Sequence, residues 1–267
     1  GAFSVVLKRA SDRFLVHPDP YLKLPIRLFL GFLTPLAAAA LLLVRRVRTL
    51  GAAAVNVATT PGQNAAMTFA GTNGQRVSLT ASVVSIPNSF VWIERPNGAT
   101  LASFSTGTSG HYMSPVTLQG TGTYTIHIDP QGNGTGHMSL DPELVQGDPV
   151  YPIVANGVVV SGTNGGAGQN ALITFNGSAS QKISLVVSNS TMGSANVSIL
   201  KPDGTTLVSS FSIGVGGGYA DTTTLPVNGT YTIKADPSGT NVGSADMQLY
   251  TVPAAGIFVG LHTARRL

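Results

Sequence analysis

The sequence predicts an all-β fold with two tandem antiparallel β-sandwiches of the jelly-roll or immunoglobulin-like kind, preceded by an N-terminal apolar helix. Three observations predict the sandwiches: an unusual composition, an internal repeat and an alternation of apolar and polar residues. Charged residues make up only 10% of the 267 residues, against about a quarter in an average globular chain, while glycine contributes 32. This mixture favours short strands joined by tight turns over helices.

The internal repeat is visible directly in the sequence. Residues 62–79 read GQNAAMTFAGTNGQRVSL and residues 168–185 read GQNALITFNGSASQKISL, with ten of eighteen positions identical. After one inserted residue, the GTYTI of residues 122–126 recurs at 229–233. A collinear match of this length indicates a duplicated module.

The duplication divides the chain into five parts. We expect a basic N-terminal segment over residues 1–51, a first sandwich over 52–145, a stiff linker over 146–156, a second sandwich over 157–252 and a tail over 253–267. The linker contains two prolines, which stiffen a connection between domains.

Within each repeat, apolar residues occupy every second position. Val77, Leu79 and Ala81 alternate with polar residues, as do Tyr124 and Ile126. A period of two with one apolar face is typical of half-buried antiparallel strands. Asn–Gly and Asp–Gly turn signals separate the runs, so that we expect about seven short strands in each repeat.

The N-terminal segment contains an apolar run over residues 28–44, seventeen residues without a charge. Arg27 precedes this run, and Arg45, Arg46 and Arg48 follow it. Length and flanking charges favour a membrane helix that anchors the chain, with the sandwiches at the cell surface or outside the cell. A signal peptide and a buried or irregular helix are the alternatives.

Charge and cysteine content exclude several classes of protein. The net charge of +4 comes from the first fifty residues, which hold eight basic and two acidic residues, whereas the rest holds seven basic and nine acidic. The sandwiches therefore lack the dense positive surface that nucleic-acid binding requires. There is no cysteine, which rules out disulfides and thiolate catalysis.

The shared motifs GQNAxxTFxG, Q[RK][VI]SL, P[ND]G[AT]TL, GTYTI and DP resemble repeats of bacterial surface and secreted proteins that carry rearrangement-hotspot (YD) repeats. More distantly, they resemble the bacterial pre-peptidase C-terminal domain, a β-sandwich appended to secreted proteases. The resemblance covers residues 52–252. It implies an accessory module for folding, secretion, surface display or attachment, without catalysis of its own.

The distribution of histidine argues against an enzyme. The three histidines of the first repeat, at positions 111, 127 and 137, align with Gly217, Lys234 and Ser244 of the second. A duplicated histidine-based site is therefore absent, and neither HExxH nor GxSxG occurs. We predict no catalytic residues and expect these histidines to face solvent.

Calcium is the one metal that the sequence suggests, at two loops that follow recurring Asp–Pro pairs. The candidate ligands are Asp129 and Asn133 in the first repeat and Asp236 and Asn241 in the second. One carboxylate in each loop is few for a calcium site, and such residues also stabilise plain turns by binding backbone N–H groups. The favoured expectation is therefore that no cofactor is needed.

Trp92 is the candidate for contact with a ligand. It lies between Val91 and Ile93, which should share the buried face of a strand, so that Trp92 points to the other side. A partly exposed tryptophan is suited to stacking on a sugar ring. Tyr124 and Tyr231 recur in both repeats and are expected to be core or corner tyrosines.

These features favour a non-enzymatic bacterial cell-surface or secreted module that serves adhesion, ligand binding or spacing. Its expected partners are an extracellular polysaccharide or protein, the membrane through residues 28–44, and no nucleic acid. The alternative is an accessory region of a larger secreted protease or YD-repeat toxin. An autonomous hydrolase is disfavoured because no nucleophile and base recur or match a motif.

Overall fold

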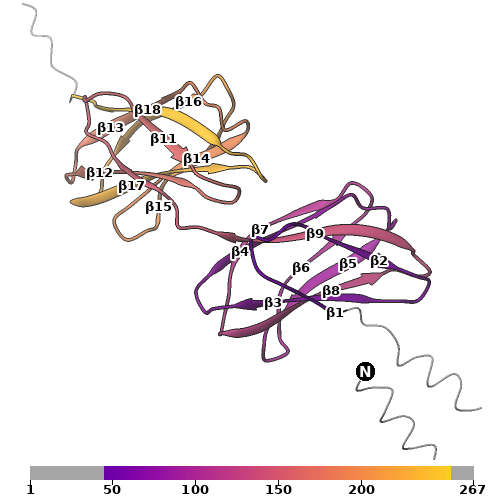
Figure 1. Cartoon of the computed structure of the whole chain (residues 1–267). Helices are drawn as coiled ribbons and strands as arrows, with labels where there is room; N and C mark the ends of the chain where they lie inside the picture. The colour runs from indigo at the N-terminus through magenta and orange to yellow at the C-terminus, as the bar shows by residue number, and fades with distance from the viewer. Residues whose placement is uncertain (1–44, 254–267) are drawn as a thin grey trace, which may run out of the picture. The chain divides into compact units, whose positions relative to one another are not determined.

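A computed structural model of the chain describes residues 45–253, and within them it contains strands and turns but no helix (Figure 1). The all-β prediction is confirmed for this part of the chain. The apolar run 28–44, predicted as a helix, lies outside the described residues. In the described part, no helix is long and apolar enough to span a membrane.

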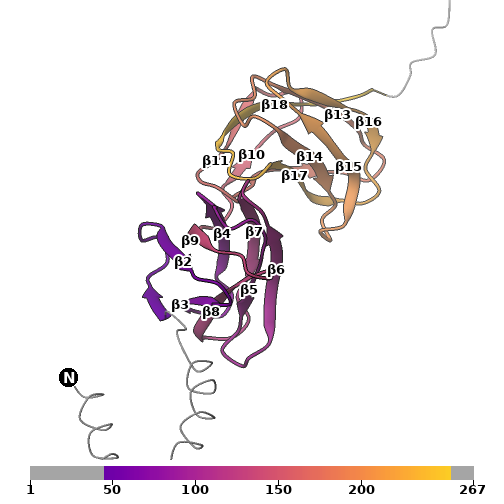
Figure 2. The ribbon, with the colours of Figure 1, turned by 90° about the vertical axis from the view of Figure 1, so that its right-hand side faces the viewer.

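The first sandwich consists of a five-stranded and a four-stranded sheet (Figure 2). The five-stranded sheet has the order β1 (Arg45–Arg48), β3 (Ala65–Gly71), β8 (Gly122–Pro130), β5 (Ser89–Glu94) and β6 (Thr100–Thr106). The four-stranded sheet has the order β2 (Val55–Thr59), β9 (Gly136–Val145), β4 (Arg76–Ser82) and β7 (His111–Thr117).

The second sandwich repeats this strand order. Its five-stranded sheet has the order β10 (Val150–Pro152), β12 (Ala171–Gly177), β17 (Gly229–Pro237), β14 (Ala195–Leu200) and β15 (Thr206–Ile213). Its four-stranded sheet has the order β11 (Val160–Asn164), β18 (Gly243–Thr251), β13 (Lys182–Ser188) and β16 (Gly218–Thr224). Corresponding strands occupy corresponding places, as a duplication requires.

Each sandwich encloses its own apolar core between its two sheets. The predicted alternation explains which side chains enter: in β5, Val91 and Ile93 are fully buried while Trp92 is only half-buried. In β17, Tyr231 and Ile233 are fully buried. Burial of one apolar face of each sheet against the other is the main source of stability in such a fold.

The strands are not all antiparallel, which corrects the predicted topology. β1 pairs in parallel with β3, and β10 pairs in parallel with β12. The reason is the path of the chain, which passes from β1 to β2 in the opposite sheet and then returns as β3 beside β1. Parallel neighbours need such a crossover connection. β1 lies before residue 52, and β10 lies within the segment expected to be a linker.

The inserted residue of the second repeat is accommodated as a β-bulge. β15 is one residue longer than β6, and its pairing with β14 shifts register between Val197 and Ile199. A bulge of this kind absorbs one extra residue without changing the strand order. Because the insertion precedes the next hairpin, the structure aligns His111 with Gly218 instead of Gly217.

Candidate functional site

Trp92 belongs to a stack of rings on the outer face of the first five-stranded sheet. Its indole stacks on Phe90 of the same strand, with ring centroids 5.7 Å apart and planes 27° apart. It also stacks on His127 of β8, at 4.5 Å and 9°. The predicted outward direction of Trp92 is thus confirmed, whereas its role in ligand contact stays a prediction.

The stack changes what Trp92 offers to a ligand. Two protein rings already cover part of the indole, so that less of it remains for a sugar ring than an isolated tryptophan would present. Phe90 is the most open member of the stack, with 39% of its surface exposed. Glu94 adds a negative charge, since its carboxylate lies 3.3 Å from Nε2 of His127.

The histidines of the first repeat contact neighbours within their own sandwich. His111 stacks on Phe104 with centroids 4.3 Å apart, His127 stacks on Trp92, and Nδ1 of His137 lies 3.0 Å from Oγ of Ser85. These contacts supply a structural role for each ring beyond the solvent-facing position that the sequence predicts.

Three of the four predicted calcium ligands, Asp129, Asp236 and Asn241, have other partners. In the first repeat, Nε2 of Gln131 donates to a carboxylate oxygen of Asp129 at 3.3 Å, and Asn133 is exposed in the following turn. In the second repeat, Nζ of Lys234 lies 2.9 Å from Asp236. Within residues 45–253, no group of three acidic, histidine or cysteine side chains is arranged to hold a metal ion.

The second asparagine of the candidate calcium set also has a structural contact. Nδ2 of Asn241 donates to the carbonyl of Ser194 at 3.4 Å, in its own sandwich. Asp203 and Asn97, which follow proline in the corresponding turn of each repeat, close plain turns: Asp203 accepts from the backbone N–H of Thr205 at 2.9 Å, and Asn97 accepts from that of Ala99 at 3.2 Å. Hydrogen bonds from Thr205 lower the pKa of Asp203. Such contacts are typical of Asx turns, whereas the turn alternative for the loops of Asp129 and Asp236 stays a prediction.

We expect thermal unfolding of the protein to be insensitive to calcium. A ligand that binds only the native state at a hundred times its dissociation constant would add about 2.7 kcal/mol to stability. Calorimetry with calcium and with chelator checks this, and the two melting temperatures should coincide. A rise in calcium that disappears in Asp236→Ala would establish the metal site and contradict the expectation.

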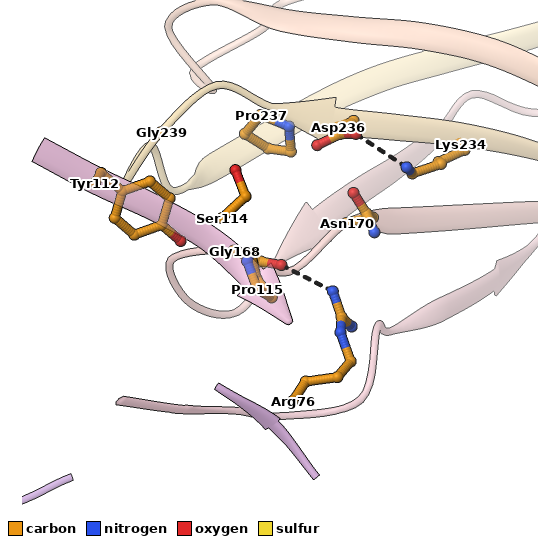
Figure 3. A pocket seen from close by; sticks show the side chains of 10 residues that line it. All are labelled: Arg76, Tyr112, Ser114, Pro115, Gly168, Asn170, Lys234, Asp236, Pro237 and Gly239. Atoms are coloured by element: carbon orange, nitrogen blue, oxygen red, sulfur yellow. Dashed lines mark hydrogen bonds and ion pairs between the residues drawn. The ribbon is translucent and has the colours of Figure 1, made fainter. Parts of the chain in front are cut away.

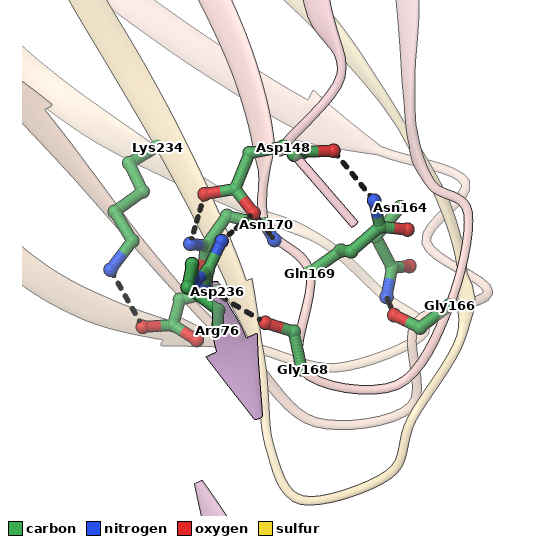
Figure 4. A network of polar contacts seen from close by, with 10 residues as sticks. Arg76, Asp148, Asn164, Gly166, Gly168, Gln169, Asn170, Lys234 and Asp236 are labelled. Atoms are coloured by element: carbon green, nitrogen blue, oxygen red, sulfur yellow. Dashed lines mark hydrogen bonds and ion pairs between the residues drawn. The ribbon is translucent and has the colours of Figure 1, made fainter. Parts of the chain in front are cut away.

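A group of polar contacts around Asp148 joins residues of the two sandwiches. Asp148, between β9 and β10, accepts from the guanidinium of Arg76 in β4 at 2.8 Å. It also accepts from the backbone N–H and the side-chain amide of Asn170, at 3.0 and 2.7 Å. Arg76 further donates to the carbonyl of Gly168 at 3.1 Å (Figure 4). We call Arg76, Asp148, Gly168 and Asn170 the junction cluster.

Electrostatics and packing support the junction cluster. Burial alone would raise the pKa of Asp148, but the hydrogen bonds from Arg76 and Asn170 outweigh it, and the pKa lies below its usual value. Gly168 has a φ of 75°. A Cβ there would approach Pro115 to 2.5 Å and the hydroxyl of Tyr112 to 2.7 Å, so that only glycine fits.

A pocket of about 210 Å³ borders the junction cluster (Figure 3). Arg76, Tyr112 and Asn170 line it together with the Lys234–Asp236 ion pair. Its volume is below the roughly 300 Å³ at which small-molecule sites usually begin. The charged groups around it are paired, Arg76 with Asp148 and Lys234 with Asp236.

Sequence reasoning missed the junction cluster. Asn170 belongs to the recurring GQN motif, which was used only as a sign of duplication. Its first copy, Asn64, is exposed, whereas Asn170 is 8% exposed, so that the motif has a different environment in each repeat. The signal present in the sequence was Asp148 itself, an acidic residue in a segment with few charges.

Comparison with known proteins gave structural similarity only. No protein-family model and no curated protein matches the chain. The pre-peptidase C-terminal domain of the collagenase from Bacillus anthracis is 13% identical, with a TM-score of 0.32, over 37% of this chain and 94% of that domain. PliG from Aeromonas hydrophila, a periplasmic inhibitor of g-type lysozyme, is 16% identical, with a TM-score of 0.31, over 40% and 100%.

A third similar structure spans more of the chain. The PBSX exported protein XepA is 11% identical, with a TM-score of 0.33, over 76% of this chain and 88% of XepA. A pre-peptidase C-terminal domain, the module that the repeats resemble, is thus among the similar structures. The link to rearrangement-hotspot repeats stays a prediction.

Proposed function

We propose that this chain is a non-enzymatic spacer module that works at the cell surface or outside the cell and holds two sandwiches in a defined relation. The junction cluster carries the proposal. Asp148 lies in the connecting segment and binds one residue from each sandwich, Arg76 and Asn170, so that a single carboxylate ties three parts of the chain together. A freely jointed linker would need no such contacts.

The chemistry of the described residues supports a role without catalysis. An active site brings a nucleophile or an acid–base pair to a pocket large enough for a substrate. Here the junction pocket is small, and Lys234 and Asp236 beside it neutralise each other. The histidine nearest to a carboxylate, His127, is stacked on Trp92 in the outer sheet face.

A ligand-binding role is the second candidate, and the ring stack of Phe90, Trp92 and His127 favours it. The second repeat has Asn196, Ser198 and Lys234 at these positions, so the stack is specific to the first sandwich. An extracellular polysaccharide or protein would be the partner. The same surface would serve an accessory region of a larger secreted protease or toxin, where the module attaches the enzyme to its target.

The spacer proposal predicts that the sandwiches of the intact chain reorient together. Asp148→Ala removes the acceptor shared by Arg76 and Asn170, and we expect the two sandwiches then to tumble with shorter, separate correlation times. NMR relaxation of backbone amides measures this. Asp203→Ala is the matched control, because its hydrogen bonds stay within its own turn and should leave tumbling unchanged.

The pH dependence of the coupling follows from the lowered pKa of Asp148. A carboxylate with a depressed pKa stabilises the structure at every pH above its ordinary value of about 3.8, and this stabilisation is lost as pH falls through the lowered pKa. Coupled tumbling should therefore persist through neutral and mildly acidic pH. Independent tumbling of the unmodified chain at pH 7 would contradict the spacer proposal.

A further inference from the structure

The chain contains an unusual number of Asn–Gly pairs, a dipeptide that can modify itself. Seven occur, and all lie within residues 45–253: Asn73, Asn97, Asn133, Asn156, Asn164, Asn176 and Asn228 each precede a glycine. Glycine has no side chain to block its own backbone nitrogen, and its flexibility lets that nitrogen approach the preceding side chain. The structure distinguishes the seven sites from one another.

The reaction is an intramolecular attack that consumes only water. The backbone nitrogen of the glycine forms a bond to the side-chain carbonyl carbon of the asparagine, and the bond from that carbon to the amide nitrogen breaks. Ammonia leaves with the proton that the glycine nitrogen loses, and a five-membered imide remains. Water then opens the ring at either carbonyl, giving aspartate or isoaspartate. Such a step depends on bringing the two reacting atoms into contact.

Six of the seven asparagines are restrained at the very group that must be attacked. In each of them the side-chain carbonyl oxygen accepts a hydrogen bond of 2.8–3.2 Å. The donor is a backbone N–H in five cases: Gly120 to Asn73, Ala99 to Asn97, Thr251 to Asn156, Gly243 to Asn164 and Ala179 to Asn228. In the sixth case the hydroxyl of Thr230 donates to Asn176.

Asn133 is the exception among these sites in the described part of the chain. It is exposed, and none of the hydrogen bonds found in residues 45–253 involves its side chain. It lies in the turn between β8 and β9. The backbone N–H of Gly134 donates to the carbonyl of Gln131 at 3.2 Å, and this hydrogen bond must break before the nitrogen of Gly134 can attack. Gly132 before it has a φ of 64°, so that the turn is flanked by glycine on both sides.

We infer that Asn133 is a site of spontaneous modification, at which the folded protein converts an amide into a carboxylate while its other Asn–Gly pairs are protected. The product places a new negative charge four residues from Asp129, in the loop that joins β8 to β9. The isoaspartate form also lengthens the backbone by one methylene, which disrupts the turn. The charge of this sandwich end would therefore change with the age of the protein.

The expected rate difference follows from the hydrogen bonds. A side chain that is held by one hydrogen bond must be freed before it can be attacked. For a typical net strength of about 1 kcal/mol, this requirement slows the attack by about fivefold. Asn228 is the matched comparison, because it lies in a turn like Asn133 but accepts from Ala179 at 2.8 Å. Asn133 should thus convert at least about fivefold faster than Asn228 in the folded chain.

Peptide mapping of the aged full-length chain separates these two sites. Cleavage before aspartate releases residues 129–140, which contain Asn133 as their only asparagine, and residues 221–235, which contain Asn228 as theirs. After incubation at pH 8 and 37 °C, mass spectrometry measures the isoaspartate product as a one-dalton gain in each peptide, and the aspartate product as a new cleavage before residue 133 or 228. We expect these changes first in residues 129–140. In the Gly134→Ala variant they should be suppressed in that peptide, because the Cβ of alanine hinders the attacking nitrogen.

Two results would overturn the inference. Equal or faster conversion of Asn228 would show that its hydrogen bond does not protect the side chain from attack. An unchanged Asn133 would show that the turn alone protects this side chain. Ageing the chain in denaturant is the internal control, since unfolding removes all six restraints and the rates at the two sites should converge. The Gly134→Ala variant keeps Asp148 and its partners, so that the outcome is independent of the spacer proposal.

Discussion

Replacement of Tyr231 by alanine should lower the free energy of unfolding of the second sandwich by about 3–5 kcal/mol. The side chain is fully buried and stacks on Phe175, with ring centroids 5.4 Å apart. Its hydroxyl donates to the carbonyl of Val227 at 2.7 Å and thereby closes the turn before β17. Alanine would leave both a cavity and an unpaired carbonyl, and denaturant unfolding followed by circular dichroism measures the loss.

Two further variants separate the contributions of Tyr231. Tyr231→Phe keeps the ring and removes the hydroxyl, so that a loss of about 1 kcal/mol is expected. Tyr219→Ala is the control for a tyrosine of the same sandwich that is 68% exposed, and its effect should stay within about 0.5 kcal/mol. If alanine at position 231 were as harmless as at 219, Tyr231 would not be part of the core.

Replacement of Arg48 by alanine should destabilise the first sandwich by about 3 kcal/mol, because the acceptors of its buried guanidinium lose their donor. Only 2% of its side chain is exposed. The guanidinium donates to the carbonyl of Leu140 at 2.9 Å, to Asp141 at 2.6 Å and to the carbonyl of Ala52. Its loss would leave these acceptors without a donor, and the same unfolding experiment measures the effect.

Arg76→Ala is the matched control for Arg48. Its side chain is 29% exposed, and its partner Asp148 keeps two hydrogen bonds from Asn170. The expected loss of stability is therefore about 1 kcal/mol or less. A loss of about 1 kcal/mol or less in Arg48→Ala as well would contradict a structural role of Arg48 within the sandwich.

Much of the fold was readable from the sequence because it rests on local patterns. Alternation of apolar and polar residues is a property of a strand and its two faces, so the burial of Val91 and Ile93 and the outward direction of Trp92 could be predicted. The recurrence of Tyr124 and Tyr231 in a strand after a turn likewise indicated a corner tyrosine. Both hydroxyls donate to a carbonyl four residues earlier, at 2.7 Å.

Only the tertiary structure decided how distant segments meet. Arg48 is buried against Leu140 and Asp141, more than ninety residues away, and in the sequence it reads as one of three charges after an apolar run. The restraint on six Asn–Gly pairs and its absence at Asn133 are equally invisible in the sequence, since most of the donors lie tens of residues away. Periodicity reports which face of a strand is buried, whereas partners across sheets and sandwiches depend on the path of the whole chain.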